Sequence, residues 1–351
     1  MSRRCRAAIV AALTVTATFE GTAWACSVFC AHDGEVVLAG NNEDYYGGDP
    51  AIIWFVPAQA QKHGYVAYGY ASNHFSQGGM NDQGLFWDGL ATPALSCSSC
   101  GGTEPFTLET LEEVMQDSAT VQEALDAFAS YDTTAIMETA QLLFADAQGS
   151  SAILEGDQVI WPQHDFQIAT NFYQSDPSLG GYPCWRYDTL ASLMQSSLPL
   201  DVDTFRQMAD AVHQGVAPGP SVYTRYTTIG DLKAGVLYLF HDMDFGRCVR
   251  FDLAEELGMP SHEYAMAELS YQPECWIASG SGGAGGAGGS DVSSPQDGPE
   301  LASAEPGTGC GCRVGPRAHA AGWMLLTMGG VALAAIRARR RRDRLPRGRA
   351  E

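Results

Sequence analysis

The sequence predicts an α+β fold in which sheets pack under helices. Strand-like segments come early in the chain, helical segments occupy its middle, and further strand-like segments follow up to residue 251. Strands at both ends with helices between them are typical of layered α+β domains. The 351 residues, 45% of them hydrophobic, suffice for one large domain or two, which excludes a wholly disordered chain and a disulfide mini-protein.

The expected elements follow in chain order. Strand-like runs at 27–40, 51–56 and 65–71 predict the first strands, with Asp33 and Gly34 as a turn. Apolar residues at three- and four-residue spacing between Leu108 and Phe128 predict helix. Two strands are expected at 141–154, helices at 187–195 and 204–213, and closing strands at 226–231, 235–240 and 247–251.

Charge is distributed unevenly along the chain. The formal net charge is -21, but only seven Lys and Arg residues, against 38 Asp and Glu, lie between residues 26 and 309. Such an acidic body repels phosphate backbones, so nucleic acid is not an expected partner.

The first 25 residues have the order of a secretory signal peptide. A basic start at Arg3, Arg4 and Arg6 precedes an apolar stretch and the small-residue site ending at Ala25. Cleavage by signal peptidase after Ala25 would make Cys26 the first residue of an exported protein. A lipoprotein site is the alternative, although Trp24 and the absence of Leu three residues before Cys26 argue against it.

The C-terminal part consists of a linker and a tail. Residues 279–309 are rich in Gly, Ser, Ala and Pro and predict a flexible spacer. Residues 310–351 hold a Cys-Gly-Cys motif, a possible membrane span at 318–336 and an Arg cluster expected on the cytoplasmic side. This tail resembles the sorting tails of myxobacterial surface proteins, which implies removal by a sorting protease and transfer to the cell surface. A permanent single-span anchor is the alternative.

Cysteine usage agrees with export. The body, residues 26–278, contains seven cysteines: Cys26, Cys30, Cys97, Cys100, Cys184, Cys248 and Cys275. If Cys26 stays free, six remain, enough for three disulfides in an oxidising compartment. The pair at 97 and 100 could form half of a zinc site, but no second pair with ligand spacing follows, which favours a local disulfide or two separate bridges. The eight histidines offer no helical metal-ligand pair either, so no metal or cofactor is expected.

An N-terminal cysteine carries a nucleophile and a base on one residue. Its α-amine has an ordinary pKa of about 7.7 to 8.0 and can accept the thiol proton. Alone this is weak support, since a disulfide to a nearby cysteine is an equally simple role for Cys26.

Several motifs accompany Cys26 in a fixed order. They are Cys-Ser-Val-Phe at 26–29, Gly-Asn-Asn-Glu-Asp at 40–44, Gly-Met-Asn-Asp-Gln-Gly-Leu at 79–85, Ala-Thr-Asn at 169–171 and Trp-Arg-Tyr at 185–187. Together they resemble the linear amide C–N hydrolases of the choloylglycine hydrolase family, over nearly all of residues 26–278. The resemblance implies a four-layer αββα sandwich of the N-terminal nucleophile hydrolase type.

The resemblance also implies roles for particular residues. Cys26 matches the nucleophile, and Asp44 the aspartate that orients the N-terminal amine, although a plain turn residue is the alternative for Asp44. Asn171 matches the side chain that donates to the oxyanion, and Ala91 falls where a backbone N–H does the same. Arg186 matches a buried arginine that braces the site, with pairing to acidic neighbours as its simpler role.

Two further positions of the motifs bear on the site. Asn81 belongs to the family signature but is expected to be structural. The family's usual Gly-Arg-Asn-x-Asp stretch has Asn41 in place of arginine here, which puts recognition of bile salts or penicillins in doubt. Residues expected to contact substrate are Asn41, Tyr45, Trp54, Phe86 and Trp87, with plain core packing as the alternative for the aromatic ones.

The predicted function is therefore hydrolysis of linear non-peptide amides. A small N-acyl amide would be cut by Cys26 in an exported, surface-sorted protein whose oligomeric state the sequence does not give. An acyltransferase or dipeptidase of the same superfamily, or a catalytically silent surface-binding module, are the alternatives.

Overall fold

The computed structural model describes residues 26–277 except 96, 98–99, 197–198 and 216–221. The predicted signal peptide, linker and tail lie outside the described residues. Within the described part, no helix has the length and apolar character that a membrane span requires. The predicted span at 318–336 lies outside that part.

Two antiparallel sheets form the centre of the molecule. The seven-stranded sheet has, in spatial order, β12 (Phe166–Ala169), β1 (Ser27–His32), β2 (Val37–Tyr46), β13 (Val222–Asp231), β14 (Val236–His241), β15 (Arg247–Asp252) and β17 (Gln272–Pro273). The eight-stranded sheet has β11 (Gln158–Ile160), β10 (Ser151–Glu155), β9 (Ala140–Ala145), β6 (Phe86–Ala91), β5 (Ser76–Asn81), β4 (Tyr65–Tyr70), β3 (Ala51–Val56) and β16 (His262–Ala265).

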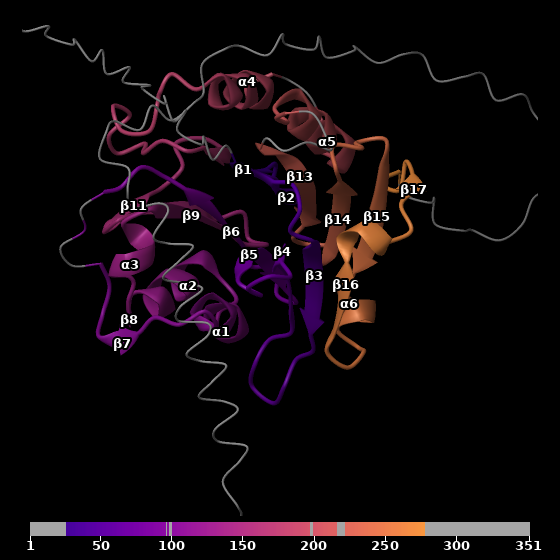
Figure 1. Cartoon of the computed structure of the whole chain (residues 1–351), viewed down its shortest axis with the longest axis horizontal. Coiled ribbons are helices and arrows are strands. Elements are labelled where there is room, and N and C mark those ends of the chain that lie inside the picture. The colour runs from indigo at the N-terminus through magenta and orange to yellow at the C-terminus, as the bar shows by residue number, and fades with distance from the viewer. Residues whose placement is uncertain (1–25, 96, 98–99, 197–198, 216–221, 278–351) are drawn as a thin grey trace, which may run out of the picture.

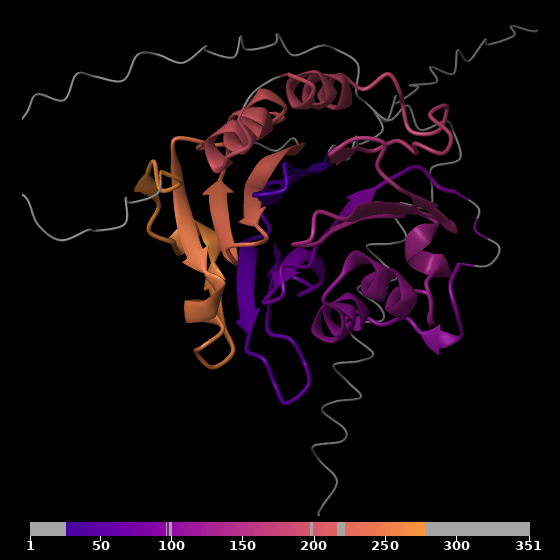
Figure 2. The same ribbon diagram turned by 180° about the vertical axis from the view of Figure 1, so that it is seen from behind.

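Helices cover the outer faces of both sheets. Figure 1 shows α4 (Trp185–Met194) and α5 (Val202–Ala211) on one side of the molecule and α1 (Thr110–Asp117), α2 (Val121–Phe128) and α3 (Thr134–Met137) on the other, and Figure 2 shows the same layers from behind. Short elements complete the fold: β7 (Glu104–Pro105) pairs with β8 (Tyr131–Asp132), and α6 (Leu253–Glu256) and the 3-10 helix Met266–Glu268 lie near the C-terminal end of the described chain.

Three apolar cores correspond to the three contacts between four layers. Strand β3 makes this visible, because Ile53 and Phe55 face the core between the sheets while Ile52 and Trp54 face the core under α1 and α2. Successive side chains of a strand point to opposite faces, so a strand buried on both sides is apolar throughout. A third core packs the seven-stranded sheet against α4 and α5. The predicted four-layer αββα sandwich is confirmed.

The predicted helical segment at 108–128 divides into two helices. Helix α1 ends at Asp117, and Thr120 begins α2 with a capping box in which its side chain accepts from the Glu123 N–H while Glu123 accepts from the Thr120 N–H. This reciprocal pair satisfies backbone donors that a new helix leaves open. Periodicity alone did not reveal the break.

Strand β5 was missed because of its glycines. A Cβ atom at Gly79 would lie 2.6 Å from the Val66 carbonyl oxygen, and one at Gly78 would collide with the Asp88 carboxylate. Glycine normally weakens a strand, but here it permits close approach of neighbouring groups.

The cysteine prediction needs one correction. Cys97 pairs with Cys100 and Cys248 pairs with Cys275, so the expected local disulfide is confirmed. Cys30, however, is a buried free thiol. The six cysteines other than Cys26 therefore do not form three disulfides among themselves, because Cys30 lies in the core between the sheets as a free thiol.

Asn81 joins the eight-stranded sheet to the end of α1. Its Nδ2 donates to the carbonyl oxygens of Met115 and Ser118 at 2.8 and 2.7 Å, and its Oδ1 accepts from the N–H groups of Gln83 and Leu85. The side chain is fully buried. The expected structural role is consistent with these four bonds.

Asn81→Ala should lower the free energy of unfolding by about 2 to 4 kcal/mol, because it leaves buried backbone groups without partners. Urea unfolding measures this, with Gln83→Ala on the same turn as an exposed control. A loss no larger than that of the control would contradict the role.

Candidate active site

A cavity of about 310 Å³ opens beside Cys26 where several strands end. It is formed by β2, by the β4–β5 turn, by the ends of β6 and β9, and by α1 and α3. Its lining residues are Cys26, Glu43, Tyr45, Tyr70, Ser72, Asn73, Phe75, Ser76, Gln77, Trp87, Gly89, Leu90, Ala91, Thr92, Leu111, Ile136, Thr139, Ala140 and Leu142. This volume lies within the usual range for small-molecule sites, about 300 to 1,000 Å³.

Strand register positions Cys26 in this cavity. Ser27 pairs with Asn42 of β2, and Val28 pairs with Ala169 of β12. Continuing both registers toward the start of β1 brings Cys26 opposite Glu43 on one side and Asn171 on the other. The pairing of two central strands thus assembles residues that lie far apart in the sequence.

The Cys26 thiol lies against a carboxyl group. Its Sγ is 3.6 Å from Glu43 Oε2 and 3.8 Å from the Asp44 carbonyl oxygen. Burial, and then the negative charges of Glu43 and Asp44, hold the pKa of the thiol well above its ordinary value. In the full sequence the Cys26 nitrogen belongs to a peptide bond with Ala25, and a peptide nitrogen does not act as a base.

Glu43 itself is buried. Burial, followed by the charge of Asp44, raises the pKa of Glu43 to about 8. Glu43 was not among the site residues predicted from the sequence. Its position in the strand could have indicated the site. Asn41, Glu43 and Tyr45 occupy every second position of β2 and therefore lie on the same face.

Asp44 points to the opposite face of β2. Its Oδ1 accepts from the Thr224 hydroxyl at 2.5 Å, whereas its buried Oδ2 has no hydrogen-bond partner among the described residues. Burial raises the pKa of Asp44 to about 7, against the opposing effects of Arg186, Thr224 and His213. The open oxygen can accept one more N–H donor.

Asn171 and Ala91 lie together on the other side of Cys26. The Asn171 Nδ2 donates to the Ala91 carbonyl oxygen at 2.7 Å, and Ala91 lines the cavity. The structure thus brings the two predicted oxyanion residues into direct contact, at the end of β6 and just after β12.

Arg186 reaches the site from the first turn of α4. Its Nη1 donates to the Cys26 carbonyl oxygen at 2.5 Å and to Ser27 Oγ at 2.9 Å, and its Nη2 donates to Asn171 Oδ1 at 2.9 Å. The side chain is fully buried. One guanidinium therefore fixes both the start of β1 and the amide of Asn171, which a planar fork of donors does well.

Asn41 lies in a buried polar network rather than at the cavity wall. Its Oδ1 accepts from the N–H and the hydroxyl of Thr228, and that hydroxyl also bonds to Tyr68, which donates to Asp88. Burial and the charge of Glu43 raise the pKa of Asp88 well above its ordinary value. The sequence analysis did not select Asp88 either.

The predicted aromatic residues separate into two groups. Tyr45 and Trp87 line the cavity. Trp54 packs in the core under α1 and α2, and Phe86 packs between the sheets, so neither is part of the cavity lining. Neighbouring strand residues such as Phe86 and Trp87 point to opposite faces, and the face alone does not decide which residues reach the cavity, since Trp54 and Trp87 belong to the same core.

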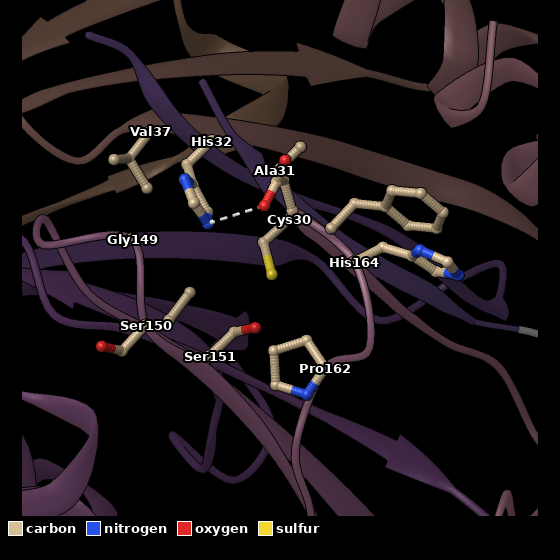
Figure 3. Close-up of a pocket in the computed structure, with 12 residues that line it drawn as sticks. Cys30, Ala31, His32, Val37, Gly149, Ser150, Ser151, Pro162 and His164 are labelled. Atoms are coloured by element: carbon tan, nitrogen blue, oxygen red, sulfur yellow. Dashed lines mark ion pairs between the residues drawn. The ribbon is translucent and has the colours of Figure 1, made fainter. Parts of the chain in front are cut away.

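A second, much smaller hollow surrounds Cys30. Figure 3 shows the Cys30 sulfur pointing toward Ser151 and Pro162. The space is about 10 Å³, enough for little more than one water molecule. Burial raises the pKa of Cys30 to about 11, so this thiol is inert by comparison with an activated one. In the described ranges, no cluster of three or more His, Cys, Asp or Glu side chains is arranged to hold a metal ion.

Two solved structures share the fold. An arginine-to-leucine variant of conjugated bile acid hydrolase from Clostridium perfringens superposes with a TM-score of 0.54 at 17% identity, covering 68% of this chain and 97% of that chain. A cysteine-to-alanine mutant of conjugated bile acid hydrolase from the same organism gives 0.51 at 16% identity, covering 68% and 96%. The chain has the αββα fold of the N-terminal nucleophile hydrolases. Identities this low show the fold alone, and neither a family model nor a curated protein sequence matches the chain.

Glu43 should make the protein less stable as the pH rises. The pKa of about 8 in the folded state exceeds the ordinary 4.5, so the folded state keeps a proton that the unfolded state loses between these values. Stability then falls as pH rises through this window, by at most about 1.4 kcal/mol per pH unit for one group.

Glu43→Gln should flatten that slope. Urea unfolding at pH 5 and pH 8 of residues 24–277, in which Cys26 keeps its peptide bond, measures it, with exposed Glu35→Gln as the control. The interpretation fails if both variants keep the wild-type slope, and Asp44 and Asp88 account for any slope that remains in Glu43→Gln.

Proposed function

We propose that this chain is an amidohydrolase that cleaves linear, non-peptide N-acyl amides with Cys26 as its N-terminal nucleophile. One observation carries the proposal. The register of β1 with β2 and β12 brings a cysteine that follows a signal-peptide-like segment against Asp44, Asn171 and Arg186 at the wall of a cavity of about 310 Å³.

Cleavage after Ala25 would free the α-amine of Cys26. That amine takes the thiol proton, and the resulting ammonium stabilises the thiolate beside it. Asp44 is suited to hold the amine, since its buried Oδ2 has no other partner among the described residues. The same positive charge opposes burial and the negative charges of Glu43 and Asp44, which together hold the thiol pKa high before cleavage.

The thiolate then attacks the carbonyl carbon of the amide. The oxyanion is held by the side-chain amide of Asn171 and a backbone N–H at Ala91, where each donor is worth about 2.7 to 4 kcal/mol of barrier. The C–N bond breaks as the α-ammonium gives its proton to the departing amine. Water attacks the thioester and gives a proton to the α-amine, the C–S bond breaks, the carboxylic acid departs, and the α-ammonium returns that proton to the thiolate.

Arg186 acts as a positioning residue in this scheme. It holds the Cys26 carbonyl and orients Asn171 through Oδ1, which leaves the Nδ2 of Asn171 directed toward Ala91. The fold that this chain shares with a hydrolase of conjugated bile acids supports amide hydrolysis as the reaction class.

We propose further that residues 1–25 direct export and that residues 310–351 attach the protein to the cell surface, with 279–309 as the spacer. Signal peptidase would then act as the activating enzyme, because it creates the free amine of Cys26.

Mature protein that begins at Cys26 should hydrolyse members of a panel of N-acyl amides. Cys26→Ala should lower kcat/KM by a factor on the order of 10³ or more, because the covalent route is lost. Cys30→Ala is the matched control, since Cys30 is a free thiol on the same strand outside the cavity. Full activity in Cys26→Ala, or equal losses in both variants, would refute the nucleophile.

A further inference from the structure

The cavity combines an apolar part with a polar part. Trp87, Leu111, Ile136 and Leu142 line it from the helix-covered side of the eight-stranded sheet. Glu43, Tyr45, Ser72 and Asn73 line it from β2 and the β4–β5 turn. An apolar chain fits the first part, and a small polar group fits the second.

Charge in the cavity has one sign. Glu43 is an acidic residue in the lining, and no Lys, Arg or His is among the described residues that line it. Asp88 adds a second buried carboxyl close enough to raise the pKa of Cys26. The cation that the proposed mechanism supplies here is the α-ammonium of Cys26, which that mechanism already uses. An anionic group bound beside Glu43 would lose its water and meet a carboxyl rather than a basic side chain, which is unfavourable.

Arg225, a cationic side chain near Glu43, already has hydrogen-bond partners. Arg225 acts on Glu43 electrostatically, but its Nη1 and Nη2 donate to the carbonyl oxygens of Tyr46 and Asp49. Position 41 carries the neutral, buried Asn41, whose Nδ2 has no hydrogen-bond partner among the described residues. Neither side chain lines the cavity.

A bound cation would change this balance. With Cys26 in its peptide bond, burial and the charge of Asp44 raise the pKa of Glu43 to about 8, so its carboxyl holds a proton at pH 7 unless a cation lies beside it. In the mature chain the α-amine of Cys26 is one further group that acts on this carboxyl. A cation beside it favours the carboxylate, and binding then releases a proton. The other groups whose charge or titration acts with Glu43 are Cys26, Asp44, Asp88, Tyr45, Tyr68, Tyr70, Tyr226 and Arg225.

We propose that Glu43 selects the substrate, so that the site prefers acyl amides of short diamines, in which an apolar acyl chain fills the arm lined by Trp87 and Leu142 and the second, cationic amino group pairs with Glu43. The proposal rests on the proposed hydrolysis at Cys26. Glu43 Oε2 is 3.6 Å from Cys26 Sγ. A short diamine bound with its amide carbon at the sulfur can therefore place its second amino group beside this carboxyl.

Kinetics with three matched amides test the selection. The dodecanoyl amides of putrescine, pentylamine and γ-aminobutyrate have amine parts of similar length that are cationic, neutral and anionic. For wild-type mature protein at pH 7, kcat/KM should be about 10- to 100-fold higher for the putrescine amide than for the pentylamine amide, and lowest for the anionic one.

Glu43→Gln should abolish the preference for the cation through KM, while the pentylamine amide is still cleaved. Glu112→Gln, on α1 and outside the cavity lining, is the matched control and should keep the preference. If Glu43→Gln keeps the preference, or lowers kcat equally for all three amides, Glu43 acts on the thiol rather than on the substrate and the proposal is overturned.

Binding to mature Cys26→Ala provides a readout that needs no turnover and keeps Glu43 intact. Calorimetry in two buffers of different ionisation enthalpy should show proton release near pH 7 with the putrescine amide and none with the pentylamine amide. Equal proton uptake or release with both overturns the selection. If wild-type protein cleaves none of the three amides but Cys26→Ala releases protons on binding the cationic one, the proposed reaction fails and the selection stands.

Discussion

The candidate site depends on one buried arginine. Arg186 extends from α4 through the outer face of the seven-stranded sheet and donates to the Cys26 carbonyl, the Ser27 hydroxyl and Asn171 Oδ1. A buried guanidinium is tolerated only when acceptors surround it, and here those acceptors belong to the residues that define the site. Its charge also opposes the effect of burial on the pKa of Asp44. The helix layer, β1 and the segment after β12 are thereby fixed in one arrangement.

Acidic side chains predominate near the face of β2 that carries Asn41 and Glu43. Asn41 stands where the family that this sequence resembles has an arginine. Glu43 and Asp88 bring two carboxyl groups close to the Cys26 sulfur. Burial raises the pKa of both groups, helped by the charge of Asp44 at Glu43 and by the charge of Glu43 at Asp88. A thiol in such surroundings is unreactive until a positive charge is added, and the α-amine released by cleavage is the charge that the proposed mechanism adds.

Much of the fold could be predicted from the sequence because both central sheets are buried on two faces. Ala51–Val56 is apolar throughout and Val236–His241 is apolar up to its last residue, and these strands were expected near their observed positions. Strand β5 escaped because its glycines serve close contacts with Val66 and Asp88, which only the tertiary structure reveals. The capping box at Thr120, which divides the predicted helical segment, was likewise not used.

The candidate site divides in the same way. Cys26, Asp44, Asn171 and Arg186 came from ordered motifs, and the structure brings their side chains or backbone groups together. Glu43 lies within one of these motifs but, like Asp88, was not selected, because what distinguishes both residues is the face of the strand and their burial. Trp54 and Phe86 lie in cores, since aromatic residues at strand spacing are distributed over both faces.

The central claim is that Cys26 becomes a free N-terminal nucleophile, and the mature chain itself tests it most directly. Intact mass and N-terminal sequencing of the exported protein, before and after iodoacetamide, should give a chain that begins at Cys26 with this thiol alone alkylated. Cys30, which burial keeps protonated, serves as the internal control that stays unlabelled. A chain that begins elsewhere, or a Cys26 that is acylated or bridged, would contradict the account.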